Sequence, residues 1–202
     1  MPNPVNVVIP TKSNFTGLAE LLSDLSLDPA IGTICIVADG QAAFDALPDP
    51  PEHILTITVP EGVGIQHMWN RGIEAVGRDA HIAFLNDDVR LSPECLSSLA
   101  NSLDNDPIIG IICPNYSTVE MAEDRQVFNT CGSRYDGTGG LAGFAMMLRS
   151  DLAKVYSFDE QLTWWYGDDD VLLWVTRTMG MHAVISHTAR CQHADSVTIR
   201  TN

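Results

Sequence analysis

The chain has 202 residues, of which 45% are hydrophobic and 18% are charged, with 11 Lys plus Arg against 26 Asp plus Glu. This length and balance predict one medium-sized domain with a full hydrophobic core. The formal net charge of −15 argues against non-specific binding to nucleic acid or to an anionic membrane, because such binding depends on clustered basic side chains.

The cysteines and the apolar segments argue against several further classes of protein. The five cysteines form no C-x-x-C pair, so neither a zinc knuckle nor a redox motif is indicated. No apolar run approaches the roughly 20 residues that span a bilayer. The first four residues lead into a strand without the basic and apolar segments of a signal peptide. We therefore expect a reducing, cytoplasmic compartment.

The first third of the chain alternates buried strands with amphipathic helices. Apolar, β-branched runs predict strands, and apolar residues at helical spacing predict helices. The polar loop that follows Pro10 contains helix-capping residues. The second strand ends at Asp39-Gly40, which places an acid at a carboxyl end. The predicted strands cover 5–9, 33–38 and 53–59, and the predicted helices cover 15–27 and 64–76.

The helix predicted over 64–76 contains Asn70-Arg71-Gly72. A glycine inside a helix costs stability unless another part of the chain approaches closely, so we expect tight packing at this point. Arg71, like Lys12 after the first strand, could neutralise a phosphate. The alternative is that both are solvated surface cations.

A fourth strand, 81–85, leads directly into Asn86-Asp87-Asp88. Side chains alternate along a strand, so Asn86 and Asp88 are expected on one side and Asp87 on the other. Open α/β sheets bind ligands at the carboxyl ends of their strands. Proteins hold Mg²⁺ and Mn²⁺ with one or two carboxylates, together with water and substrate phosphate. The alternative is that these residues only form a turn between a strand and a helix.

Less regular patterns follow in the middle of the chain. Ser92 is predicted as the N-cap of the next helix, with Pro93 in its first position. A fifth strand is predicted over 108–113, and residues 114–138 are expected to form a loop or small hairpin that lines a cleft. A short apolar run over 144–148 comes next.

The final part of the chain places aromatic residues directly before acidic ones. Trp164-Trp165-Tyr166 supply flat faces of the kind on which sugars or bases stack. Asp168-Asp169-Asp170 could stabilise a helix N-terminus, or could abstract a proton, because neighbouring carboxylates raise one another's pKa. A helix is predicted over 171–179 and a last strand over 182–185. The whole alternation predicts a single α/β domain with a mostly parallel central sheet flanked by helices.

Six separated pieces of the chain, in this order, resemble the family 2 nucleotide-sugar glycosyltransferases, which have a Rossmann-like GT-A fold. They are similar to the first strand and Pro-Thr turn of that family, its "VVDDG" strand, its "NRG" helix with the DXD strand end, its "GAFLLVRR…GFDE" stretch, its "YGED" turn and its closing "HxxS". The corresponding residues are Val7 to Thr11, Ile36 to Gly40, Asn70 to Gly72 with Ala83 to Asp88, Gly143 to Arg149 with Phe158 to Glu160, Tyr166 to Asp169, and His193 to Ser196. Together they are specific for the family, though not for a substrate.

This resemblance implies a metal-dependent, inverting transfer of a sugar from a nucleoside-diphosphate sugar to an acceptor hydroxyl. It implies that Asp88 and His193 coordinate Mn²⁺ or Mg²⁺, and that Asp169, with Asp168 beside it, deprotonates the acceptor. Residues 1–113 would bind the nucleotide sugar, and residues 114–202 would form the acceptor and catalytic half. The other implied contacts are Pro10, Thr11, Asp39, Asn70, Arg71, Asn86 and Asp87 for the nucleotide sugar, and Trp164, Trp165 and Tyr166 for the acceptor.

The chain departs from the family pattern at three positions. Ala38 replaces the first acid of "VVDDG", so the base-reading acid is either missing or replaced by Asp39, and the nucleotide is left open. The DXD pattern begins with Asn86, so Asp88 is the surer metal ligand and Asp87 is the alternative that could substitute for the missing acid. Asp168 replaces the Glu of "YGED", so the base is either Asp168 or Asp169.

Two other functions are weighed against the transferase. A sugar nucleotidyltransferase needs a glycine-rich phosphate loop after its first strand, and residues 10–13 contain no glycine. An inactive sugar-nucleotide-binding protein would be expected to lose the base, whereas both Asp88 and Asp169 are present. The acceptor is left open between a small molecule, a glycan, a protein side chain and a modified DNA base. A homodimer is compatible with the sequence.

Overall fold

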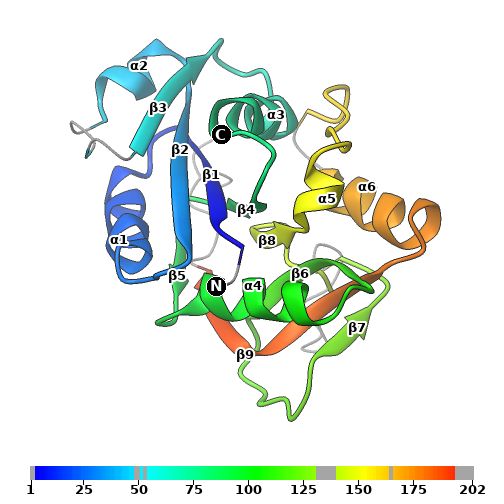
Figure 1. The fold of residues 1–202 in the computed structure, drawn as a ribbon. Coiled ribbons are helices and arrows are strands. Elements are labelled where there is room, and N and C mark those ends of the chain that lie inside the picture. The colour runs from blue at the N-terminus through cyan, green and yellow to red at the C-terminus, as the bar shows by residue number, and fades with distance from the viewer. Residues whose placement is uncertain (1–2, 48–50, 52–53, 131–139, 164–165, 194–202) are drawn as a thin grey trace.

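The computed structural model describes residues 3–47, 51, 54–130, 140–163 and 166–193. Within these residues one large sheet runs through the molecule, and helices cover both of its faces (Figure 1). The expected α/β domain with a helix-flanked central sheet is confirmed. The strands are β1 (Val5–Thr11), β2 (Ile31–Asp39), β3 (Ile54–Val59), β4 (His81–Leu85), β5 (Val89–Leu91), β6 (Ile109–Asn115), β7 (Arg125–Val127), β8 (Ala145–Leu148) and β9 (His182–His193). The helices are α1 (Phe15–Leu25), α2 (Gln41–Asp45), α3 (Ile65–Val76), α4 (Cys95–Asn105), α5 (Ser150–Ala153) and α6 (Gly167–Leu173), followed by a π-helical turn, η2 (Trp174–Thr178).

The sheet is parallel in its first half and mixed in its second. Its order is β3-β2-β1-β4-β8-β6-β9-β5, with β7 paired to β9. Strands β3, β2, β1 and β4 are parallel, so their carboxyl ends meet at one edge. Strand β8 is antiparallel to both β4 and β6, and β6 is parallel to β9. The start of β8 and the end of β9 therefore reach the same edge as the carboxyl end of β4.

Helices α1 and α4 are joined on one face of the sheet by the buried carboxylate of Asp28, which follows α1. Its Oδ2 accepts hydrogen bonds from the backbone N–H groups of Leu96 (2.8 Å) and Ser97 (3.1 Å). The predicted cap at Ser92 is wrong, because α4 begins at Cys95 and Glu94 has a left-handed backbone. A distant side chain thus satisfies the N–H groups that a local cap would have served.

Helix α3 packs on the parallel strands, and the expected close approach at its internal glycine is confirmed. A Cβ atom on Gly72 would lie 2.2 Å from Cγ1 of Val8 in β1, which is too close for any side chain. The absence of a side chain therefore brings α3 down onto the core of the sheet. Packing offsets the helix-forming propensity that this glycine lacks.

The second half differs most from the sequence-based prediction. Strand β9 runs to His193, eight residues beyond the predicted end, because it pairs with β6, β7 and β5 in succession. The short strands β5 and β7 and the helix α2 were not predicted. Helix α6 begins at Gly167, which places the acidic run in its first turn.

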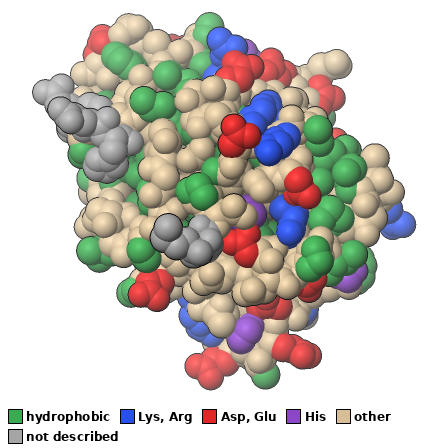
Figure 2. All heavy atoms as spheres, in the orientation of Figure 1, with side chains coloured by type: hydrophobic (Ala, Val, Ile, Leu, Met, Phe, Trp, Pro, Cys, Tyr) green, Lys and Arg blue, Asp and Glu red, His purple; other side chains and the backbone are tan. Residues whose placement is uncertain are grey.

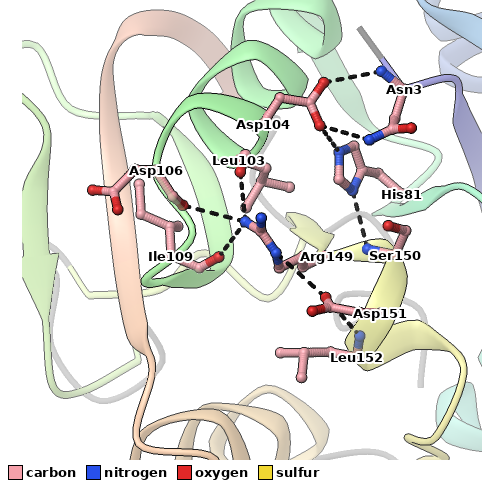
Figure 3. A network of polar contacts seen from close by, with 10 residues as sticks. All are labelled: Asn3, His81, Leu103, Asp104, Asp106, Ile109, Arg149, Ser150, Asp151 and Leu152. Carbon is pink, nitrogen blue, oxygen red and sulfur yellow. Dashed lines mark hydrogen bonds and ion pairs between the residues drawn. The ribbon is translucent and has the colours of Figure 1, made fainter.

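A polar network closes the amino-terminal edge of the sheet around His81, the first residue of β4 (Figure 3). His81 Nδ1 accepts the backbone N–H of Ser150 at 3.0 Å, and its Nε2 lies 3.2 Å from Oδ1 of Asp104. Asn3 donates to Asp104 from both its backbone and its side chain. The Arg149 guanidinium donates to three backbone carbonyls nearby, those of Leu103, Asp106 and Ile109.

The surface fits the acidic composition. Figure 2 shows acidic and basic side chains interspersed on the face in view, without a large basic area. No helix in the described ranges is long and apolar enough to cross a membrane. Four of the five cysteines are buried, and Cys131 lies outside the described residues. The cytoplasmic location stays a prediction.

Candidate active site at the carboxyl edge of the sheet

The two carboxylates after β4, Asp87 and Asp88, point to different partners, as alternation along the strand predicts. Asp87 turns toward β1, where its Oδ2 accepts a 2.6 Å hydrogen bond from the Thr11 hydroxyl. Burial raises the pKa of Asp87 to about 6, and the neighbouring charge of Asp88 adds to this rise. The Asn14 amide donates to the Asp87 carbonyl at 3.1 Å. Asp87 thus ties β1 and the loop before α1 to the end of β4.

Asp88 turns the other way, toward the last residue of β9. Strand β5 pairs with β9 so that Val89 lies opposite His193, and this brings His193 Nε2 to 3.0 Å from Asp88 Oδ1. Both side chains are almost buried, with 11% of Asp88 and 12% of His193 exposed. Despite the short distance, neither atom makes a hydrogen bond of acceptable geometry within the described part of the chain. Two buried polar atoms without hydrogen bonds are costly unless something else binds them.

The Asp88 and His193 pair fits a small divalent cation. A carboxylate oxygen and an imidazole nitrogen are both ordinary ligands of Mn²⁺. Two ligands at right angles, each about 2.1 Å from one ion, stand roughly 3 Å apart, which agrees with the observed spacing. Among the described residues no group of three His, Cys, Asp or Glu side chains is arranged to hold a metal. Water and donor phosphate would therefore have to complete the coordination sphere.

Aromatic packing holds the imidazole of His193 in place. The Phe144 ring is stacked on it, with centroids 4.1 Å apart and planes only 4° from parallel. Tyr116 in turn packs edge-on against Phe144 at 5.5 Å. Phe144 also binds the strand end of β4, because its carbonyl accepts the Asn86 N–H at 2.9 Å. The imidazole is thereby fixed in position beside Asp88.

The acidic run after Tyr166 divides into three separate environments. Asp168 lies against the backbone of Gly143, and burial together with the charge of Asp169 raises its pKa. Asp169 accepts a 2.9 Å hydrogen bond from the Thr130 hydroxyl. Asp170 accepts one of 2.7 Å from the Tyr156 phenol, which packs in the core. Only the first two carboxylates are thus placed toward the Gly143 segment and the residues that follow β7.

Gly143 and Phe144 bring the acidic turn and the Asp88–His193 pair together. A Cβ atom on Gly143 would lie 2.6 Å from Oδ2 of Asp168, so only glycine allows this carboxylate to pack there. The next residue, Phe144, carries His193 on its ring. Two adjacent residues have Cα atoms about 3.8 Å apart. Asp168, one of the two candidate bases, and His193, one of the two candidate metal ligands, therefore flank one dipeptide.

The predicted base-reading residues lie at the ends of the neighbouring strands. Pro10 is part of β1, opposite Val37 of β2. Asp39, at the end of β2, is buried. Its Oδ1 accepts the Gly62 N–H at 2.7 Å, and its Oδ2 lies 3.4 Å from Nζ of Lys12. Both oxygens of Asp39 therefore have partners within the protein, and its contact with a base stays a prediction.

Two predicted residues on α3 bind neighbouring parts of the protein. The Asn70 amide donates to the Phe158 carbonyl and accepts the Phe158 N–H, both at 2.9 Å. Arg71 is exposed and pairs with Glu74, one turn further along, at 2.6 Å. Their roles toward a donor stay predictions.

Tyr166 precedes α6 with a left-handed backbone (φ 69°), and 66% of the residue's surface is exposed. A non-glycine residue in this conformation is strained, and such strain clusters at functional sites. Trp164 and Trp165, the other predicted acceptor contacts, lie outside the described residues.

The sequence-based prediction missed Thr130, Phe144 and Tyr116. Phe144 lies in the segment Gly143 to Arg149, which resembles a family motif, and this resemblance could have marked Phe144 as a candidate site residue. Thr130 and Tyr116 lie in the weakly periodic region 114–138, which gave no residue-level signal. A cavity of about 560 Å³ between α4, β7 and β9 contains none of the predicted site residues.

Comparison with known proteins shows the family of the chain. The sequence profile of glycosyl transferase family 2 matches residues 6–156, which is most of the chain. The chain belongs to glycosyl transferase family 2. No curated protein matches it in sequence.

Solved structures share the GT-A fold of this family 2 chain at low sequence identity. The crystal structure of GalNAc-T7 with UDP, GalNAc and Mn²⁺ aligns with a TM-score of 0.73 at 12% identity, covering 98% of this chain and 45% of that one. The mannosyltransferase PcManGT from Pyrobaculum calidifontis, in complex with GDP-Man and Mn²⁺, aligns with a TM-score of 0.68 at 15% identity, covering 98% of this chain and 59% of that one. TarS from S. aureus (residues 1–349) aligns with a TM-score of 0.62 at 15% identity, covering 93% of this chain and 60% of that one. This family 2 chain thus spans about half to three fifths of the length of these structures.

Proposed function

We propose that this chain is a divalent-cation-dependent glycosyltransferase that moves a sugar from a nucleoside-diphosphate donor to an acceptor hydroxyl with inversion. The observation that carries the proposal is the Gly143-Phe144 dipeptide, which packs against the acidic turn through one residue and against His193 through the next. A transfer reaction needs both a carboxylate base and a means of stabilising the leaving diphosphate, close together.

The donor would occupy the amino-terminal half, 1–113, at the ends of the parallel strands. Thr11, Asp39 and Asn86 stand there, at the edge where α/β sheets bind ligands. Asp88 and His193 would hold Mn²⁺ or Mg²⁺, and a cation bound to them would offset the charge that gathers on the diphosphate as it leaves. The Asp88–His193 pair supports this role because both of its facing atoms are buried without a hydrogen bond.

The acceptor would enter beside the acidic turn in the carboxyl-terminal half, 114–202. A carboxylate of that turn takes the proton of the acceptor hydroxyl, and the acceptor oxygen forms a bond to the anomeric carbon of the donor. The bond from that carbon to the diphosphate oxygen breaks, and its electron pair leaves with the diphosphate. Attack on the face opposite the leaving group inverts the configuration. Exposed Tyr166 offers a flat face on which the acceptor can stack.

A thermal-shift panel tests the donor side of this proposal. The protein would be heated with UDP, GDP, TDP and their common sugars, each with Mn²⁺, Mg²⁺ or EDTA. A ligand that binds only the folded state at about 100 times its Kd adds roughly 2.7 kcal/mol of stability. We expect one nucleotide class to raise the melting temperature with metal and not with EDTA. The absence of any metal-dependent shift would overturn the proposal and favour turn chemistry at Asn86-Asp87-Asp88.

Turnover of the stabilising donor tests the catalytic side. Nucleoside diphosphate release would be followed in the wild type and in Asp169→Asn, and the anomer of the released sugar would be read by NMR. Loss of turnover in the variant with donor binding retained would support catalysis. An active Asp169→Asn variant would instead assign the role of base to Asp168. Full activity in both Asp168→Asn and Asp169→Asn would contradict catalysis by a carboxylate of this turn.

A further inference from the structure

The hydroxyl of Thr130 is the group that distinguishes the two candidate bases. It donates a 2.9 Å hydrogen bond to Oδ1 of Asp169, across 39 residues of sequence. Resting on the glycosyltransferase function proposed above, we infer that Thr130 is a positioning residue that orients Asp169 as the base for the acceptor hydroxyl. The sequence left open whether Asp168 or Asp169 is the base, and this inference assigns the role to Asp169.

Thr130 is itself held firmly enough to orient another side chain. It is buried, with 6% of its surface exposed, and its backbone forms a β-bridge with Leu141. The Leu141 N–H donates to the Asn129 carbonyl at 2.8 Å, which joins the same two segments. Tyr116 holds the second segment from the far side, because its hydroxyl accepts the Gly140 N–H and donates to the Gly140 carbonyl. A β-branched side chain in such a bridge has few rotamers, so its hydroxyl has a defined direction.

The hydrogen bond from Thr130 occupies only one oxygen of Asp169. In the ranges that the structure describes, Oδ2 of Asp169 has no hydrogen-bond partner, so this atom can receive a proton from an acceptor. An aspartate with two rotatable bonds and no partner would sample several orientations. A hydroxyl that anchors Oδ1 confines these orientations and leaves Oδ2 in one place, which is the kind of preorganisation on which proton transfer depends.

Asp168 lacks the equivalent arrangement. Its Oδ2 lies against the backbone of Gly143, where there is no room for a substrate oxygen between the two. No side-chain hydroxyl among the described residues donates to Asp168. Backbone N–H groups of the turn also contact the Asp168 carboxylate, which packs against Gly143. Asp169 is the carboxylate that a side-chain hydroxyl anchors at one oxygen, with the other oxygen left without a hydrogen bond in the described ranges.

The test compares Thr130→Val, which has the same shape but no hydroxyl, with Thr130→Ser, which keeps the hydroxyl. The substrate is the nucleotide sugar selected by the thermal-shift panel, with water as acceptor, and release of nucleoside diphosphate gives kcat and KM. We expect Thr130→Val to lower kcat about 10- to 100-fold. KM for the donor and the Mn²⁺ dependence should stay as in the wild type, and Thr130→Ser should recover most of kcat.

A purely structural role for Thr130 would give a different result. In that case Thr130→Val would lower the melting temperature and raise KM without a selective loss of kcat, and the inference would be overturned. Wild-type kcat in Thr130→Val, together with an inactive Asp169→Asn, would also overturn it while leaving the proposed function intact. The proposed function itself fails by a different outcome, namely no turnover of any donor by the wild type.

Discussion

The two ends of strand β4 differ in how fully their polar side chains are hydrogen-bonded. At its start, His81 has a partner for each ring nitrogen, and Arg149 nearby donates to three carbonyls (Figure 3). Beyond its end, Asp88 meets His193 with both facing atoms buried and without a hydrogen bond. The five buried residues of β4 connect these ends through the core. The closed network stabilises the fold, whereas the proposed function would have the Asp88–His193 pair gain stability when a cation binds. Variants at each end should therefore separate stability from binding.

The largest expected effect on stability comes from the closed end. Arg149→Met removes a cation that donates to the carbonyls of Leu103, Asp106 and Ile109, and it leaves these partly buried or exposed acceptors with fewer partners. We expect the free energy of unfolding to fall by about 3 kcal/mol, measured by urea denaturation. Mn²⁺ binding to the folded fraction should not change. A loss below roughly 1 kcal/mol would show that water replaces the guanidinium without cost.

The largest expected effect on binding comes from the other end. Asp88→Asn removes the only negative charge that faces His193 within the described residues, and we expect Mn²⁺ affinity to drop at least 100-fold, or about 2.7 kcal/mol. Isothermal titration with Mn²⁺ and the stabilising nucleotide measures this change. Asp104→Asn is the matched control, because it alters a carboxylate at the closed end of β4. Equal Mn²⁺ affinity in both variants would show that Asp88 is not a ligand.

A smaller effect concerns pH and the buried imidazole of His81. Burial lowers the pKa of His81, while Asp104 and Asp151 oppose the shift and Arg149 adds to it. The unfolded chain therefore takes up a proton before the folded one, so stability is complete above about pH 6.5 and declines as the pH falls further. The slope should reach at most about 1.4 kcal/mol per pH unit.

Denaturation curves between pH 7.5 and 5 check the prediction for His81. The variant His81→Gln should lose this component of the slope. Asp104→Asn should steepen it, because the carboxylate that favours the charged imidazole is gone. An unchanged slope in His81→Gln would assign the pH dependence to other groups.

The smallest expected effect lies in the aromatic support of His193. Phe144→Leu keeps an apolar side chain of similar size but removes the stacked ring, and we expect Mn²⁺ affinity to fall by about 1 kcal/mol, or roughly fivefold. Phe144→Tyr keeps the ring and should bind Mn²⁺ like the wild type. If Phe144→Leu also bound Mn²⁺ normally, the Asp88–His193 contact alone would suffice to orient the imidazole.

Most elements of the first half, other than α2 and β5, and the family could be predicted from the sequence alone. Buried strands, helical spacing and acids at strand ends are local patterns, and local patterns depend mainly on which neighbouring residues can be buried together. The tight packing at Gly72 could be predicted in the same way, because a glycine in a helix interior is unfavourable without a close neighbour. The order of the motifs then identified the family.

Which distant residues meet depends on how the strands and helices pack across the whole fold. His193 reaches Asp88 because β9 continues along β5, and the cap of α4 comes from Asp28 rather than from Ser92. The contact between Thr130 and Asp169 depends on a bridge between segments whose sequence shows no period. Strand register and helix contacts are set by packing over the whole core. A local pattern therefore predicts where a carboxylate stands in its own strand or helix, but not which partner it meets.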